Sequence, residues 1–195
     1  VLFRSVNHDD LWSFEGKNVP IHWHNDLEIN LIREGEAVFQ VYQKSYRVRT
    51  GEGFLLNRNV PHSCSSPGNE HVRYSTILVR PDFLYGDFGS DVERKCFQPF
   101  LQNSAIPCIH LTGFDENGKE ILWKLNQVEE AFDRKRFCYE LKIKGLLCEA
   151  FAMILYGHRQ ELTKFVPANL QELERLEKML NYLNMHFTEV ISLQD

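Results

Sequence analysis

The sequence lacks the cysteine spacing that builds a disulfide framework or a zinc ribbon. Its cysteines are odd in number and scattered, and no two of them form a Cys-x-x-Cys pair. The five are Cys64, Cys96, Cys108, Cys138 and Cys148. This usage is typical of reduced thiols, so we expect a cytoplasmic protein rather than a secreted one held by disulfides.

Long apolar runs and an excess of basic residues are also missing. No run approaches the roughly 18 apolar residues of a membrane-spanning helix, and no signal peptide is visible, so we expect no membrane partner. The 22 Lys and Arg residues are outnumbered by 27 Asp and Glu, which gives a net charge of -5. Phosphate contacts need a clustered excess of cationic side chains, so these residues alone are poorly suited to bind nucleic acid.

One stretch, from Gly16 to Gly35, gathers metal-ligating residue types. His22 and His24 stand two residues apart, so both side chains point to the same face of an extended segment. Glu28 has the same parity and can share that face whether the strand continues or turns at residues 25–26. Imidazole nitrogens and carboxylate oxygens are ordinary ligands of Zn, Fe, Ni or Mn, so this stretch predicts a metal or ligand site.

Short apolar runs separated by turn residues follow at close spacing. Strands are expected at residues 27–32, 37–42, 46–49, 54–56, 72–79 and 106–111. This spacing is typical of a β-barrel or β-sandwich. Tyr74 and Thr76 share one face of their strand, and we take them, with Asn30 and Trp12, as candidate contacts to a bound small molecule. The alternative is that these four are ordinary strand residues.

The period changes after residue 112. Asp115 is a candidate N-cap, and the apolar residues at 121, 125, 128 and 132 form one stripe of a helix. A second helix is expected from about residue 137 to 156, with an apolar face wide enough to pack against two neighbours, one of them a second subunit. Residues 161–170 read as a linker. Residues 171–195 hold a third amphipathic stripe and then a capping box at Ser192, so Asp195 reads as a cut within a longer protein.

The pattern Gly-x5-His-x-His-x3-Glu-x6-Gly over residues 16–35 resembles the first motif of the cupin superfamily. A second cupin motif, Pro-x-Gly-x-x-His, has its histidine at His62, whereas Asn57 and Asn59 replace the Pro and Gly and Ser66 stands where Asn is usual. The resemblance implies a mainly β fold with added helices: a cupin barrel (double-stranded β-helix, jelly-roll) over residues 1–112. His22, His24, Glu28 and His62 would then point into its lumen. They would hold a divalent metal (Zn, Ni, Fe or Mn), or hydrogen-bond one another and water without one.

A barrel, a helical pair over 113–160, a linker and the pattern of residues 173–195 together resemble the AraC/XylS family of bacterial transcription regulators. Residues 47–63 also resemble the sensor domain of that family. The resemblance implies a sensor domain that binds a small effector, such as a sugar or another metabolite, and forms a homodimer through the helices of 116–158. Residues 171–195 would begin a helix-turn-helix module, whose DNA-reading helices would lie beyond Asp195.

Two other functions use the same residues. One is a metal-dependent cupin enzyme, a dioxygenase or isomerase, and the other is a metabolite-binding cupin without regulatory output. The helix-turn-helix-like tail and the replacements at Asn57 and Asn59 favour a regulator that is not an enzyme.

Overall fold

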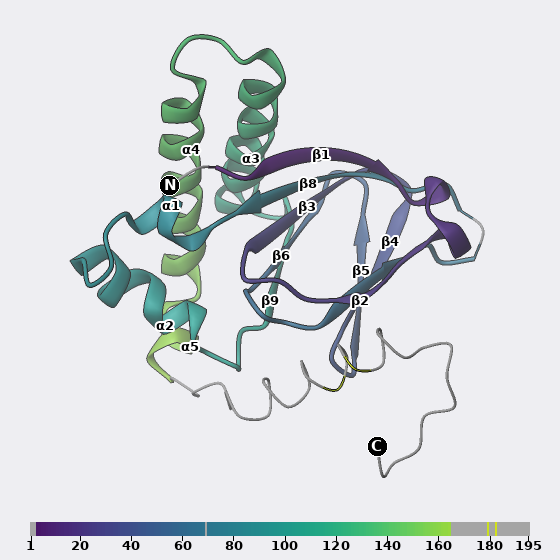
Figure 1. The fold of residues 1–195 in the computed structure, drawn as a ribbon, viewed down its shortest axis with the longest axis horizontal. Helices are drawn as coiled ribbons and strands as arrows, with labels where there is room; N and C mark the ends of the chain where they lie inside the picture. The colour runs from purple at the N-terminus through teal and green to yellow at the C-terminus, as the bar shows by residue number, and fades with distance from the viewer. Residues whose placement is uncertain (1–2, 69, 165–178, 180–181, 183–195) are drawn as a thin grey trace.

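The computed structural model describes residues 3–68, 70–164, 179 and 182 of the 195-residue chain. Its core is a pair of antiparallel sheets that face each other, with a group of helices beside one of them (Figure 1). The predicted third helix and helix-turn-helix start at 171–195 fall almost entirely outside the described residues, as does most of the predicted linker.

The two sheets divide the described strands five to four. The first sheet has the spatial order β1 (Ser5–Asp10), β8 (Arg73–Val79), β3 (Leu27–Glu34), β6 (Gly53–Leu56) and β9 (Cys108–Leu111). The second has the order β2 (Asn18–His22), β7 (His62–Ser65), β4 (Glu36–Val41) and β5 (Lys44–Arg49). Every pairing between these strands is antiparallel. The predicted cupin-type barrel is therefore confirmed.

Strand β3 shows how the sequence separates the two faces of the first sheet. Ile29 and Leu31 point outward into a core shared with the helices, whereas Ile32 belongs to the core between the sheets. Glu28 and Asn30, of the opposite parity to Ile29, are buried on the inner face. Because both faces of this strand are covered, it reads as a nearly continuous buried segment rather than a half-exposed one.

The two glycines that bound the first motif have backbone conformations that favour glycine. Gly16 has φ 72° and Gly35 has φ 81°, both in the left-handed region. A Cβ added to Gly35 would lie 2.2 Å from the carbonyl oxygen of His71. The turn from β3 to β4 therefore requires glycine at this position.

Short helices lie between the strands and longer ones follow them. The short ones are η1 (Leu11–Ser13), η2 (Glu15–Lys17), α1 (Pro81–Tyr85), η3 (Glu93–Phe97) and α2 (Gln98–Leu101). The longer ones are α3 (Glu116–Arg134) and α4 (Tyr139–Gly157), and α5 (Arg159–Thr163) follows α4 directly. Asp115 caps α3 as predicted, because its carboxylate accepts a 2.7 Å hydrogen bond from the amide of Gly118. Within the described ranges, no helix has the length and apolarity to span a bilayer.

Helices α3 and α4 stand side by side next to the first sheet (Figure 1). Ile121, Leu125 and Val128 of α3 are buried in the same core as Ile29 and Leu31. This agrees with the predicted stripe. Part of the predicted linker is helical, since residues 161–163 belong to α5.

Candidate functional site

The four predicted metal-ligating residues meet inside the barrel, although they come from both sheets. His22 ends β2 and His62 begins β7, whereas Glu28 lies on β3 of the facing sheet and His24 on the connection between β2 and β3. Their ligating atoms all lie within 4.8 Å of one another. Glu28 and His62 are buried, and the two other histidines are half-buried. We call these four residues the lumen cluster.

Each imidazole of the lumen cluster is oriented by a backbone carbonyl. The Nδ1 atoms of His22, His24 and His62 lie 2.9, 3.1 and 2.8 Å from the carbonyl oxygens at residues 20, 26 and 60. A carbonyl oxygen can only accept, so Nδ1 carries the proton in each ring. In the neutral form, each Nε2 then offers a lone pair to the lumen, which is the arrangement that metal-binding histidines use.

The short contacts between the imidazole Nε2 atoms and the Glu28 carboxylate require a positive charge between them. Nε2 of His24 lies 2.7 Å from Oε2 of Glu28, and Nε2 of His62 lies 3.5 Å from the same oxygen. Two lone pairs repel at such distances, so either a second proton on an imidazole or a metal cation must lie between them. Nε2 of His62 has no hydrogen-bond partner among the described residues, although its side chain is only 2% exposed. These residues therefore fit a divalent metal.

The electrostatics of the cluster favour a charged carboxylate. Burial by itself disfavours the ionised form of Glu28. The hydrogen bond from His24, the nearby imidazole of His62 and the hydrogen bond from Asn30 outweigh burial and hold the pKa of Glu28 well below its ordinary value. Burial likewise opposes a charge on His62, but the carboxylate of Glu28, 3.5 Å from its Nε2, raises the pKa of His62 above the ordinary value. Burial, and then the nearby charge of His62, lower the pKa of His22.

A chain of hydrogen bonds extends from the lumen cluster to two predicted effector contacts. Asn30 donates to Oε1 of Glu28 at 2.7 Å, and the Thr76 hydroxyl donates to Oδ1 of Asn30 at 2.9 Å. Thr76 also lies 3.5 Å from a carboxylate oxygen of Asp9. The carboxylate of Glu28 is thus held on two sides.

The cluster lines a cavity of about 300 Å³ between the sheets. All four cluster residues line it, as do the predicted contacts Asn30, Tyr74 and Thr76. The other lining residues are Asp9, Phe14, Val19, Phe39, Cys64 and Leu78. The volume is at the lower end of the range for small-molecule sites.

Trp12 is the one predicted contact that the structure places elsewhere. It lies on η1 and its side chain is 47% exposed. Its indole nitrogen donates to the carbonyl of Glu70 at 2.9 Å, and the ammonium of Lys17 lies 3.9 Å from the ring centroid. The indole therefore closes a surface turn and does not line the cavity.

Asp9 is a cavity residue that the sequence analysis missed. It lies on β1 opposite Tyr74 of β8, so its position follows from the register between these strands. Burial and the charge of Glu28 raise the pKa of Asp9, whereas the hydrogen bond from Thr76 opposes this. The only sequence signal for Asp9 is the alternation of side chains along residues 5–10. That alternation does not show which face lines the cavity until the pairing with β8 is known.

The two asparagines that replace Pro and Gly in the second motif each have a structural role in the turn. The Asn57 side chain donates to the carbonyl oxygens of Phe100 and Ile106 and accepts from the amide of Arg58. Asn59 has φ 56°, a left-handed conformation that asparagine tolerates. The turn is therefore held by these contacts without Pro and Gly, and His62 lies with the other cluster residues in the lumen.

Comparison with known proteins agrees with this geometry. The family model of AraC-like ligand-binding domains matches residues 11–108, which is half of the chain and covers the whole lumen cluster. The chain belongs to this family. The chain is also 24% identical over 178 residues to YdeC, an uncharacterized HTH-type transcriptional regulator of Bacillus subtilis (strain 168). That match covers 91% of this chain but only 59% of YdeC.

Two solved structures share the fold of the chain over nearly its full length. Apo ToxT K231A from Vibrio cholerae gives a TM-score of 0.54 at 16% identity, covering 97% of this chain and 67% of ToxT. Wild-type ToxT with a bound unsaturated fatty acid gives 0.53 at 16% identity, covering 91% and 62%. At this identity, the likeness concerns the fold alone.

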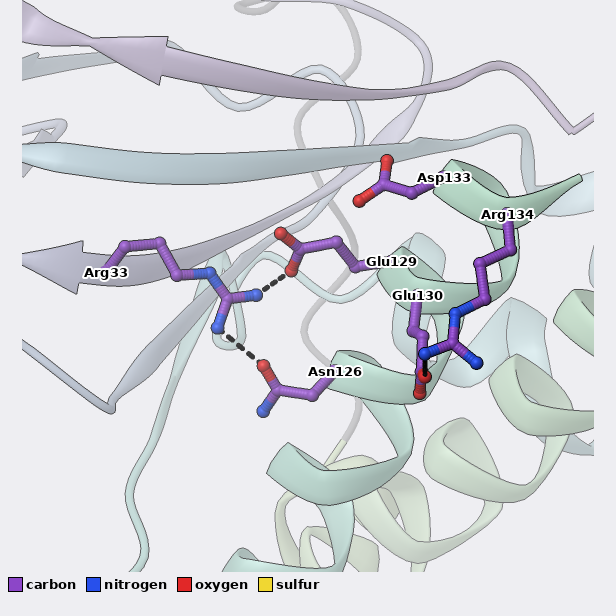
Figure 2. A pocket seen from close by; sticks show the side chains of 6 residues that line it. All are labelled: Arg33, Asn126, Glu129, Glu130, Asp133 and Arg134. Carbon is purple, nitrogen blue, oxygen red and sulfur yellow. Dashed lines mark hydrogen bonds and ion pairs between the residues drawn. The ribbon is translucent and has the colours of Figure 1, made fainter.

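A second polar group joins the barrel to α3. Figure 2 shows Arg33 reaching from β3 toward α3, where its guanidinium pairs with Glu129 and donates to Asn126 at 2.5 Å. The hydroxyl of Ser75, which is fully buried on β8, accepts from Arg33 at 3.2 Å and donates to Glu129 at 2.9 Å. His8 of β1 contacts Asp133 at 3.1 Å. We call these six residues the junction cluster.

Proposed function

We propose that this chain is the effector-sensing and dimerisation unit of a DNA-binding transcription regulator. The observation that carries this proposal is a lumen of about 300 Å³ between the two sheets, with polar lining residues Glu28, Asn30 and Thr76, in a chain of this family. A small metabolite, such as a sugar, would bind in this lumen. DNA would be contacted by another part of the gene product, because the net charge of these residues is negative.

We propose that His22, His24, Glu28 and His62 hold a divalent metal such as Zn, Ni, Fe or Mn. The orphaned Nε2 of His62 and the fixed tautomers of the three rings support this. When bound, the metal would supply a positive centre that anchors an oxygen or nitrogen atom of the effector. Elemental analysis should find stoichiometric metal in the protein and in His110→Ala, whose imidazole pairs with Glu52 on the surface, but not in His62→Ala.

We propose that a second copy of the chain packs on the outer face of α4. Leu141 and Tyr156 are 71% and 70% exposed there, and Ala152 between them is also exposed. At the helical rotation per residue, these positions fall within an arc of about 60°. Trp123 of α3 is a further large exposed apolar residue, at 57%. Such a stripe is costly to leave in water, which favours a subunit interface.

The dimer proposal is tested by sedimentation of the purified protein. Leu141→Glu should raise the dimer dissociation constant at least about tenfold, since a charge would be buried in the interface. Phe88→Glu is the matched control, because Phe88 is 89% exposed and lies outside the helical pair. Equal dissociation constants for the two variants would exclude this face.

The regulatory proposal is tested on the full gene product that carries this chain. Its affinity for DNA upstream of its own gene is measured with and without candidate metabolites, because an effector must prefer one of two states to change DNA binding. Absence of sequence-specific DNA binding would end the regulatory proposal. Turnover of a metabolite that stops in His24→Ala would instead support the cupin enzyme.

A further inference from the structure

A second hollow adjoins the lumen at His24. This hollow, which we call the vestibule, has a volume of about 590 Å³. It is lined by Arg4, His24, Asn25, Asp26, Arg58, Arg80, Pro81, Asp82 and Tyr85. His24 lines both the vestibule and the lumen cavity. A molecule bound in the lumen therefore has a polar compartment next to it.

The vestibule has an excess of positive charge because only two of its three arginines are paired. Arg4 forms an ion pair with the buried carboxylate of Asp26. Arg80 binds Asp82 with two hydrogen bonds, of 3.1 and 2.5 Å. Arg58 makes no side-chain hydrogen bond or ion pair with any residue that the structure describes. One guanidinium is therefore left free to bind an anion from solution.

The backbone around Arg58 is fixed, so the guanidinium projects from a rigid base. Its amide donates to the side chain of Asn57 at 2.8 Å, and that side chain in turn donates to the carbonyl of Phe100 in α2 and to the carbonyl of Ile106. The next amide, of Asn59, donates to the carbonyl of His24 at 2.8 Å. This bond links the arginine-bearing turn directly to the residue shared by the two hollows.

Tyr85 adds a neutral donor to the same hollow. Burial and the nearby carboxylates raise the pKa of Tyr85, while the guanidinium groups of Arg58 and Arg80 act in the opposite direction. The phenol is thus protonated at neutral pH and able to donate. A guanidinium and a phenol that face one compartment can recognise carboxylate or phosphate oxygens.

We propose that the vestibule binds the anionic group of the effector, which makes the effector a small organic acid with a carboxylate or phosphate. Arg58 is the principal contact, and the uncharged body of the ligand extends past His24 into the lumen. This inference rests on the proposed function of the lumen as an effector site. The vestibule then selects acids over neutral molecules of the same shape.

The test compares matched ligands by calorimetry on the purified protein. The pairs are glucuronate and glucose, galacturonate and galactose, and hexanoate and hexanamide, with glucose 6-phosphate and orthophosphate added to separate phosphate from carboxylate recognition. At least one acid should bind about tenfold or more tightly than its neutral partner. Arg58→Gln should remove most of that advantage and leave the neutral partner unaffected, whereas Arg58→Lys should retain part of it.

Arg94→Gln is the control variant, because Arg94 pairs with Asp91, both side chains are exposed, and neither residue lines the vestibule. The inference is overturned if no acid binds more tightly than its neutral partner, or if the advantage survives in Arg58→Gln. Equal binding of acid and neutral partners would leave the effector site standing without a selective vestibule. Acid binding through Arg58, together with DNA binding that no acid changes, would refute the regulatory role and leave the vestibule standing.

Discussion

Replacement of Arg33 by methionine should destabilise the protein by breaking the contact between barrel and helices. The guanidinium of Arg33 pairs with Glu129 and donates to Ser75 and Asn126. Methionine keeps the apolar part of the side chain and removes these polar contacts. The carboxylate of Glu129 is only 15% exposed, so it would lose its main partner while remaining largely out of water.

The expected loss follows from this burial. Removing one partner of a fully buried ion pair costs about 3–5 kcal/mol. The Arg33 side chain is 31% exposed, which lets water replace part of the lost interaction, so we expect a loss of about 2–3 kcal/mol. Glu129→Gln keeps a hydrogen-bonding group and should cost less. In the double variant, the two losses should not add, with a coupling energy of about 1–2 kcal/mol.

The coupling energy is measured by urea unfolding of the two single variants, the double variant and the parent, followed by circular dichroism. The same cycle on Arg94 and Asp91 is the control, since their side chains are 60% and 61% exposed. An exposed pair of this kind should couple by less than about 0.5 kcal/mol. If the Arg33–Glu129 cycle gives no more than this control, the junction cluster is not an energetic link between β3 and α3.

Three further predictions concern single positions. Asn59 has φ 56°, so Asn59→Ala should lose about 1 kcal/mol of unfolding free energy while Asn59→Gly loses almost none; equal losses would show that the left-handed backbone is not the cause. Burial and the charge of Glu28 raise the pKa of Cys64 to about 12. A thiol reagent at about pH 8 should therefore modify the exposed Cys96 and Cys138 in the folded protein but not Cys64. Peptide mapping that finds Cys64 of the folded protein labelled at a similar rate would contradict this. In metal-free protein, the pKa of Glu28 is lower in the folded state than its ordinary value of 4.5. The contribution of the Glu28 carboxylate to the free energy of unfolding is therefore complete above about pH 4.5 and is lost as the pH falls further. The stability difference between the parent and Glu28→Gln should therefore shrink from about pH 6 to about pH 3, and a constant difference would refute the charge balance derived for the cluster.

The first motif was predictable because its residues obey a local rule. His22 and His24 share parity on an extended segment, and the glycines at 16 and 35 mark the turns that bound the motif. That rule does not reveal that the chain changes sheets between His22 and Glu28. Placement of these ligands across a lumen came from the family resemblance, and the structure agrees with it.

Features that depend on pairing between distant segments were not predictable. Strand β7 has only four residues, and its sequence of His, Ser, Cys and Ser has no apolar period. Trp12 was taken as a candidate contact to a bound small molecule, but its side chain is fixed by the carbonyl of Glu70 at the surface. The partners of Arg33 lie 42 to 96 residues away in the chain, and no local pattern connects them.

Side chains alternate between the two faces of β1 and β8, and this alternation connects the lumen physically to the helices. On β8, Thr76 lines the cavity and its neighbour Ser75 bonds to Glu129 of α3. On β1, Asp9 lines the cavity and its neighbour His8 bonds to Asp133. Adjacent residues of one strand face opposite sides, so a ligand that displaces either strand from inside must also move a junction contact on the outside. If this route operates, the effector should alter the Arg33–Glu129 coupling energy, which the same double-variant cycle measures in the presence of ligand.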